Sequence, residues 1–182
     1  MDFSQLQLSL EDREWEYSYT DHDRQIVRAV VFDKDGYFYF VRAERDDDFG
    51  KATLIETSGG GVETGEDYET ALLRELKEEL GGEVQILCKI GVVDDYYNLI
   101  HRHNINNYYL CRVKSFGEKK LTQDEIESFH LQTLRLTFDE AVCEYERCAV
   151  TKIGRLVRNR ELPVLMHAKS ILDFMSKSEN ND

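Results

Sequence analysis

Residues 58–82 read Ser-Gly-Gly-Gly-Val-Glu-Thr-Gly-Glu-Asp-Tyr-Glu-Thr-Ala-Leu-Leu-Arg-Glu-Leu-Lys-Glu-Glu-Leu-Gly-Gly, a glycine triplet followed by a carboxylate-rich segment. Apolar residues recur in this segment at helical spacing, and Gly81-Gly82 is a typical helix end. We therefore predict a helix over residues 67–80, with Thr64 or Glu66 as its cap. The glycines before it allow the backbone to come close to a ligand.

Three glutamates of this predicted helix share one side of it. Glu75 precedes Glu78 and Glu79 by three and four residues, so their carboxylates lie together beside the apolar stripe. Like charges at these spacings repel each other and weaken a helix, and Arg74 offsets only part of the repulsion. Hard divalent cations prefer oxygen ligands, so the pattern favours a metal site. The alternative is a solvated acidic face, because runs of charge usually face water.

The spacing of the motif is more specific than its composition. Five residues separate Gly60 from Glu66, and seven more precede the run Arg74-Glu75-Leu76-Lys77-Glu78-Glu79-Leu80-Gly81. This stretch resembles the Nudix box of the Nudix hydrolase family, G-x5-E-x7-R-E-U-x-E-E-x-G-U, in which U is apolar. Every position matches except the last, where Gly82 replaces an aliphatic residue. Chance would produce such a match roughly 10⁻⁶ times in a chain of this length.

The resemblance implies an α+β fold, a Nudix-type α/β/α sandwich with a mixed sheet and a C-terminal helical extension. We expect strands at 26–32, 37–41, 84–93 and 107–113, with a charged loop at 44–50. Residues 15–19 alternate as in a strand. A capping box at Thr137 predicts a helix to about Cys148, and another is expected at 162–176 with Pro163 in its first turn. We divide the chain into an N-terminal extension (1–24), a Nudix hydrolase domain (25–150) and a C-terminal helical extension packed on the same domain (151–182), with a polar tail from residue 176.

The resemblance also implies a chemistry. Nudix hydrolases cleave nucleoside diphosphates linked to another moiety by attack of water at phosphorus, with Mg²⁺ or Mn²⁺. By the match, the metal ligands would be Glu75, Glu78, Glu79 and the Gly59 carbonyl. Arg74 would orient a ligand carboxylate, and Gly60 and Glu66 would support the cofactor-binding loop.

The general base of many family members is a glutamate on a loop after the box. Glu118, Glu125 and Glu127 lie in that region here, and we favour Glu125. A solvated acidic loop is the alternative for each of them.

The composition of the chain limits the classes of partner that it is expected to bind. With 23 Lys and Arg against 36 Asp and Glu, the net charge is −13, which disfavours binding to nucleic acid or to an anionic membrane. No apolar run is long enough to span a bilayer, and the first residues do not resemble a secretory signal. The four cysteines form no metal or disulfide pattern, so we expect reduced thiols and a cytoplasmic location. The expected partner is a small-molecule nucleotide, and a homodimer is possible.

Two other functions stay open. A non-catalytic Nudix domain could sense a nucleotide, although such domains usually lose box glutamates. A prenyl diphosphate isomerase of the same fold is disfavoured by the intact box. Outside the box, the basic segment 152–160 could clamp a phosphate, but we favour a solvated helix or loop face. The nucleoside diphosphate derivative itself is not indicated by the sequence.

Overall fold

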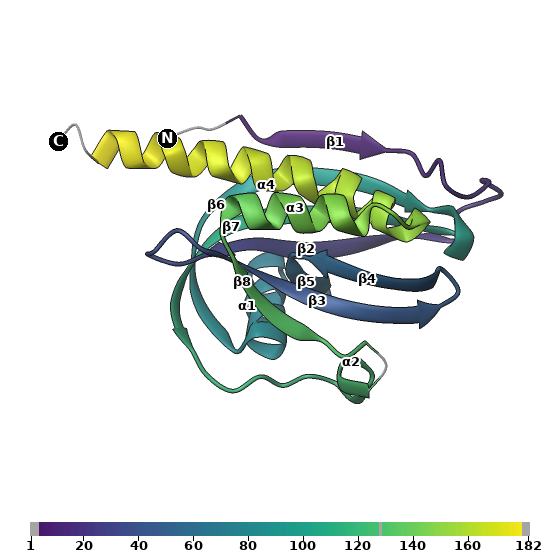
Figure 1. The fold of residues 1–182 in the computed structure, drawn as a ribbon, viewed down its shortest axis with the longest axis horizontal. Helices are drawn as coiled ribbons and strands as arrows, with labels where there is room; N and C mark the ends of the chain where they lie inside the picture. Colours follow the sequence, from purple (N-terminus) through teal and green to yellow (C-terminus); the bar gives the residue numbers. More distant parts are fainter. Residues whose placement is uncertain (1–3, 128, 180–182) are drawn as a thin grey trace.

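A mixed sheet forms the centre of the molecule (Figure 1). The computed structural model describes residues 4–127 and 129–179, apart from the side chains of Asp124, Glu125 and Glu179. Its strands are β1 (Leu6–Leu10), β2 (His22–Phe32), β3 (Phe38–Asp47), β4 (Gly50–Glu56), β5 (Ser58–Gly61), β6 (Gly82–Tyr97), β7 (Arg102–Phe116) and β8 (Gln132–Leu136). Their order is β1-β6-β7-β2-β3-β4, with β5 paired to β2 and β8 to β3. The β1–β6 and β2–β7 pairs are parallel and the other pairs are antiparallel.

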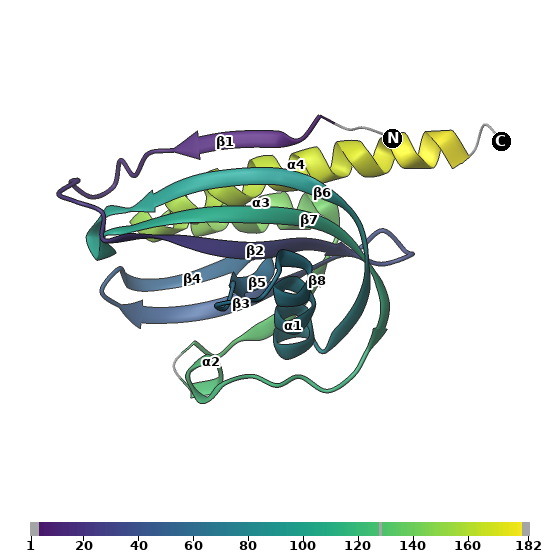
Figure 2. The same ribbon diagram turned by 180° about the vertical axis from the view of Figure 1, so that it is seen from behind.

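Helices cover both faces of the sheet. They are α1 (Tyr68–Leu80), α2 (Gln123–Glu127), α3 (Phe138–Cys148) and α4 (Lys152–Glu179), with a short 3-10 helix at Asn98–Ile100. Helices α3 and α4 lie on the face turned to the viewer in Figure 1, and α1 lies on the face seen in Figure 2. The predicted α/β/α sandwich with a mixed sheet and a C-terminal helical part is confirmed.

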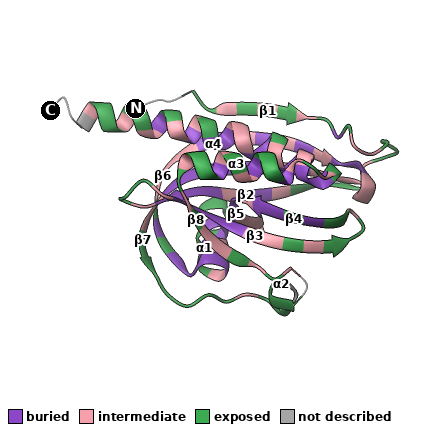
Figure 3. Ribbon diagram, viewed as in Figure 1, coloured by how far each residue is buried: buried purple, intermediate pink, exposed green. Residues whose placement is uncertain are grey.

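Each face of the sheet has its own core, and β2 supplies residues to both. Val27, Ala29 and Val31 pack toward α1, whereas Val30 and Phe32 pack toward α3 and α4. Successive side chains of a strand point to opposite faces, which explains this alternation. Figure 3 shows the result as buried segments along the central strands and on the inner sides of the helices.

The last helix begins earlier than the sequence analysis predicts. Helix α4 starts at Lys152, and Pro163 lies inside it rather than in its first turn. A proline inside a helix costs about 3 kcal/mol. Buried residues spaced three and four apart offset that cost on both sides of the proline: Ile153, Leu156, Val157, Val164, Leu165 and Ala168.

Three local expectations are also corrected. Residues 44–50 are not a loop, because β3 runs to Asp47 and pairs there with Gly50 of β4. Residues 15–19 form no strand, and the N-terminal strand is β1. Helix α1 is capped by Asp67, whose carboxylate accepts the Thr70 amide at 2.9 Å, because it is the residue adjoining the first helical turn.

The expected end of the first helix and the expected capping box are confirmed. Gly81 ends α1 in the left-handed conformation, and the Thr137 capping box opens α3. The four cysteines are free. No helix within the described residues is long and apolar enough to cross a membrane. The division at residues 24 and 150 stays a prediction; β1 of the first segment belongs to the same sheet as the rest.

Candidate active site

The glycine strand β5 lies unusually close to its neighbours. Gly59 has φ of +151°, and a Cβ there would collide with the Val27 carbonyl oxygen of β2. A Cβ at Gly60 would collide with the carboxylate of Glu75. Glycine is therefore required at Gly59, whereas a side chain at Gly60 would displace the Glu75 carboxylate, which lies directly against the backbone of β5.

Glu79 is the most enclosed carboxylate of the motif. It is 9% exposed, and its Oε2 accepts hydrogen bonds from Ser58 Oγ at 2.6 Å and from the Gly59 amide at 2.9 Å. Burial raises its pKa to about 7, with a smaller contribution from the charge of Glu75, although the Ser58 and Gly59 hydrogen bonds act in the opposite direction. The metal-free carboxylate thus holds a proton up to about neutral pH.

Arg74 ties helix α1 to the loop that precedes it. Its Nε and Nη2 donate to the two Glu66 oxygens at 3.0 and 2.9 Å, and Nη2 also donates to the Gly61 carbonyl at 3.1 Å. Nη1 donates to Glu75 at 2.8 Å and more weakly to Glu78 at 3.4 Å. The Arg74 hydrogen bonds lower the pKa of Glu66. This geometry suits the predicted role of Arg74 in orienting Glu75.

The structure brings some of the predicted ligands together and leaves others apart. Glu75 and Glu79 both face β5, whereas the Glu78 side chain is 40% exposed at the outer edge of Arg74. Among the described residues, no group of three or more His, Cys, Asp or Glu side chains is placed to hold a metal ion. Arg74 engages Glu75 and Glu78, while Ser58 and Gly59 engage Glu79, so the three carboxylates do not converge in this conformation.

The glutamates considered as general base follow the box in the chain. Glu125 belongs to the short helix α2, and its side chain lies outside the described residues. Glu118 and Glu127 are exposed, and Glu127 accepts a hydrogen bond from Gln123 at 2.9 Å.

The donor chemistry of the motif fits a hard divalent cation. Every available ligand is an oxygen, and Glu75 and Glu79 both lie against the glycine strand. The charge of Glu75 contributes to the raised pKa of Glu79, and a cation between the two would relieve that repulsion.

A pocket of about 320 Å³ opens beside Glu79 and carries a group of arginines that the sequence analysis did not identify. Arg24 is exposed as a whole residue, yet burial of its guanidinium, with Arg102 and Arg28 nearby, lowers its pKa. A cationic pocket in an acidic protein suits an anionic ligand. Its lining residues are Arg24, Arg28, Val41, Ala43, Arg45, Glu56, Thr57, Gly59, Glu79, Phe129 and Leu131.

A larger pocket, about 690 Å³, lies between β1, β6 and α4. It contains none of the box residues, and apolar side chains such as Leu156, Leu162 and Met166 form much of its lining. The chemistry of the lining, rather than the volume, makes the smaller pocket the candidate active site.

A buried charged network lies on the other side of the glycine strand, and the sequence analysis misplaced its central residue. Arg160 was expected on a solvated face but is 2% exposed. It donates to Glu161 at 3.0 Å, to Tyr97 at 2.7 Å and to Glu56 at 2.6 Å, and it pairs with Asp95 at 3.2 Å. Arg28 also pairs with Glu56, at 3.2 Å. Burial opposes ionisation of Glu56, but Arg28 and Arg160 together lower its pKa.

A signal for this network was present in the sequence. Arg160 and Glu161 fall at the three- and four-residue spacings that connect Leu156 and Val157 to Val164 and Leu165. A helix continued through Pro163 would have placed both charges on the buried face.

Comparisons with known proteins point to the same family as the sequence motif does. Residues 22–148 match the family model described as NUDIX domain. Among solved structures, a NUDIX hydrolase from Nitrosomonas europaea superposes with a TM-score of 0.60 at 20% identity, over 86% of this chain and 90% of that chain. A UDP-X diphosphatase superposes with a TM-score of 0.54 at 15% identity, over 84% of this chain and 66% of that chain. A MutT protein from Methanosarcina mazei Go1 superposes with a TM-score of 0.53 at 16% identity, over 69% of this chain and 85% of that chain. At these identities the structural likeness shows the fold alone. No curated protein matches the chain.

Proposed function

The chain belongs to the Nudix family, as a Nudix pyrophosphohydrolase, and on that premise we propose that it cleaves a pyrophosphate bond in a nucleoside diphosphate linked to another moiety. One observation carries the proposal: Glu75 and Glu79 of α1 lie against the glycine strand, and Glu79 lines a pocket that also contains arginines. Carboxylates suit a divalent cation and arginines suit phosphate oxygens, and a pyrophosphate substrate needs both.

The residues that would hold the cofactor, Mg²⁺ or Mn²⁺, are Glu75, Glu78, Glu79 and the Gly59 carbonyl. When bound, the metal neutralises phosphate charge and lowers the pKa of the attacking water. Glu78 would have to turn inward from its exposed position and leave its 3.4 Å contact with Arg74. Arg74 orients Glu75 through the 2.8 Å hydrogen bond, and Glu66 holds Arg74 in place.

The pocket residues bind and orient the substrate in this proposal. Arg24 lines the pocket, where the charge of Glu75 offsets part of the effects that lower its pKa, and its guanidinium suits a phosphate oxygen. Arg45 is paired with Asp47 at 2.8 and 2.6 Å and lies over the Phe129 ring, where it would shape the pocket wall. Phosphoryl transfer depends mainly on such positioning and charge stabilisation. Glu125 remains the proposed general base.

Hydrolysis of a substrate panel tests the proposal. Nucleoside diphosphate derivatives would be incubated with MgCl₂ or MnCl₂, and phosphate would be measured after phosphatase coupling. We expect metal-dependent release from at least one derivative, abolished by EDTA. Nucleotide binding without release would favour the alternative, a non-catalytic nucleotide-sensing domain.

Two further expectations belong with this function. We propose a cytoplasmic protein, supported by the four free cysteines, of which Cys111 and Cys148 are buried. A homodimer stays a prediction, and light scattering coupled to gel filtration would test it.

A further inference from the structure

The backbone of Thr57, just before the glycine strand, is held by two charged side chains, the fully buried Glu161 and Arg28, whose side chain is 12% exposed. Its amide donates to Glu161 Oε2 at 3.2 Å, and its carbonyl accepts from Arg28 Nη1 at 3.0 Å. The next two residues, Ser58 and Gly59, are those that donate to the Glu79 carboxylate. Hydrogen bonds at Thr57, Ser58 and Gly59, joined by the backbone of these three residues, therefore link helix α4 to the candidate metal ligand.

Several neighbouring side chains hold the Glu161 carboxylate in place. It is 0% exposed, and its Oε1 accepts from the Tyr108 hydroxyl at 2.9 Å and from Arg160 Nε at 3.0 Å. The Tyr145 hydroxyl donates to Oε2 at 3.4 Å, and Arg28 lies 3.8 Å from Oε1. So many partners leave the carboxylate a single orientation, which presents Oε2 to the Thr57 amide.

A contribution to the stability of the fold does not by itself explain why charged side chains are buried around Glu161. Replacing a buried ionic network with well-packed apolar residues is often neutral or stabilising. Glu161 also lies outside residues 22–148, the part of the chain that matches the family. The helical extension thus contributes a residue that bonds to the backbone next to the glycine strand.

We propose that Glu161 is a positioning residue for the active site: by holding the Thr57 amide it sets the position of Ser58 and Gly59, and through them the position of the Glu79 carboxylate. This inference rests on the proposed function, because the role of Glu79 as a metal ligand is proposed there. Residues that orient a metal ligand typically change metal affinity or activity by about 10–100-fold when mutated.

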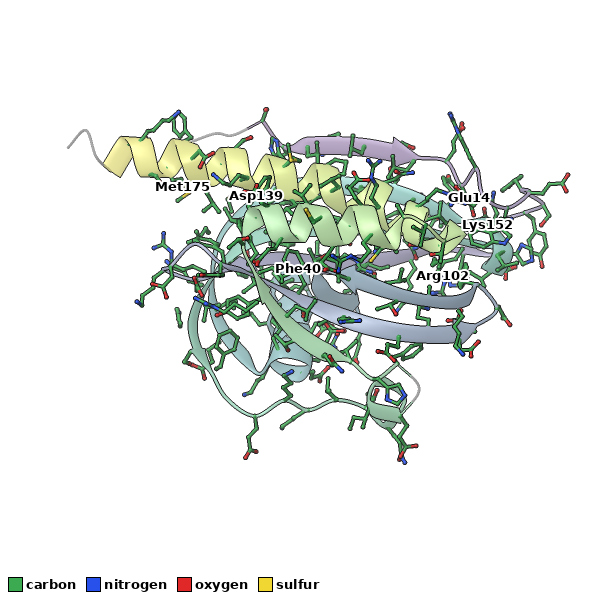
Figure 4. All side chains as sticks on the ribbon, viewed as in Figure 1. Glu14, Phe40, Arg102, Asp139, Lys152 and Met175 are labelled. Carbon is green, nitrogen blue, oxygen red and sulfur yellow. The ribbon has the colours of Figure 1, made fainter. Side chains whose placement is uncertain are left out.

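A matched control exists on the same helix. Arg155 of α4 donates to both oxygens of Glu14 at 2.7 and 2.6 Å, and this pair joins α4 to the N-terminal segment. Figure 4 shows Glu14 near Lys152, at the beginning of α4. Arg155→Gln therefore weakens the attachment of α4 without altering any contact of the Thr57 backbone.

The test compares Glu161→Gln and Arg155→Gln with the wild-type chain. Amide hydrogen exchange of Thr57 and Gly59 is measured by NMR in metal-free protein, Mn²⁺ binding by electron paramagnetic resonance, and kcat and KM on the substrate found with the panel. For Glu161→Gln we expect about 10-fold faster exchange at Thr57 and Gly59, about 10-fold weaker Mn²⁺ binding and a fall in kcat larger than the change in KM. For Arg155→Gln we expect all of these values to stay near wild type, with only a lower melting temperature.

Tyr108→Phe serves as a second variant if Glu161→Gln does not fold. It removes one donor that fixes Glu161 but no charge, so we expect effects in the same direction and about threefold in size. Wild-type exchange, Mn²⁺ affinity and kcat in a folded Glu161 or Tyr108 variant would overturn the proposal, as would equal effects in Arg155→Gln. If the wild-type chain neither binds Mn²⁺ nor hydrolyses any substrate, the proposed function fails, while the exchange measurement still reports on the link from Glu161 to Gly59.

Discussion

Two arginines organise two charged networks on opposite sides of the glycine strand, and the networks differ in how they are assembled. Arg74 is 25% exposed and pairs with carboxylates one to eight residues away in the sequence. Arg160 is 2% exposed, and its partners include Glu56 and Asp95, which are 104 and 65 residues away. The first network forms within one loop and one helix, whereas the second exists only after the sheet and α4 have come together.

The difference in burial implies a difference in role. Ion pairs near the surface contribute little to stability, because water already solvates the separate charges. In a buried network, removing one member leaves the others without compensation, at a much larger cost. We therefore expect the Arg74 network to matter mainly for function, and the Arg160 network for both folding and function.

Breaking each network at its arginine gives the largest expected contrast. Arg160→Met should reduce the free energy of unfolding by about 3–5 kcal/mol, because Glu56, Asp95 and Glu161 would remain buried with fewer partners. Arg74→Met should cost about 1 kcal/mol or less. Urea unfolding of both variants measures the two values, and similar losses would refute the distinction between the networks.

Removing the central carboxylate separates function from stability on the Arg74 side. Glu79→Gln should lower kcat at least about 100-fold, equivalent to ~2.7 kcal/mol, while the melting temperature stays near wild type. The amide oxygen can still accept from Ser58 and Gly59, which is why the fold should persist. Glu69→Gln, an exposed change on the same helix, is the control and should be fully active. Retention of more than about a tenth of the activity by Glu79→Gln would rule out its role as a metal ligand.

The affinity for Mn²⁺ should depend on whether Glu79 is protonated. Its folded-state pKa is raised to about 7, so below that pH a cation must displace the proton. The affinity for Mn²⁺ should therefore rise about fivefold from pH 6 to 7 and by less than about twofold above pH 7. The same shift makes metal-free protein lose stability as pH rises from about 4.5 to 7, since the folded state holds the proton more tightly. Mn²⁺ titrations at several pH values test this, with Glu79→Gln as a control that should bind weakly and show a flatter profile. An equal pH dependence in the variant would assign the proton to another group.

The smallest effect concerns the beginning of α1. Asp67→Ala should lower the free energy of unfolding by about 1 kcal/mol, because the carboxylate accepts from both the amide and the hydroxyl of Thr70. Thr64→Ala should leave stability unchanged, since Thr64 does not cap the helix. Thermal melts of the two variants compare them, and a larger loss in Thr64→Ala would show that the cap is misassigned.

Sequence reasoning succeeded where the determinants are close together along the chain. Helix α1, its end at Gly81 and the capping box at Thr137 follow from local chemistry, and the spacing from Gly60 to Gly81 was enough to indicate the family and hence the sandwich. The roles of Glu75, Glu78, Glu79 and Arg74 remain predictions that the geometry supports.

What escaped prediction depends on contacts between distant segments. Arg24, Arg28 and Arg45 lie on β2 and β3 without a recognisable spacing, and only the folded sheet gathers them at one pocket. Arg160 looked like part of a basic surface because Pro163 suggested that no helix preceded it. The burial of apolar residues of α4 on both sides of Pro163 outweighs the cost of a proline inside a helix. Rules based on neighbouring residues in the sequence do not include this burial energy.

The central claim is that α1 and the glycine strand together hold a divalent cation. Crystals soaked in MnCl₂ and measured at a wavelength where manganese scatters anomalously would locate the ion directly. We predict a peak within about 2.1 Å, the distance typical of magnesium, of oxygens from Glu75 and Glu79, with Glu78 turned inward. A manganese peak away from these carboxylates, or none at concentrations that support hydrolysis, would contradict the account.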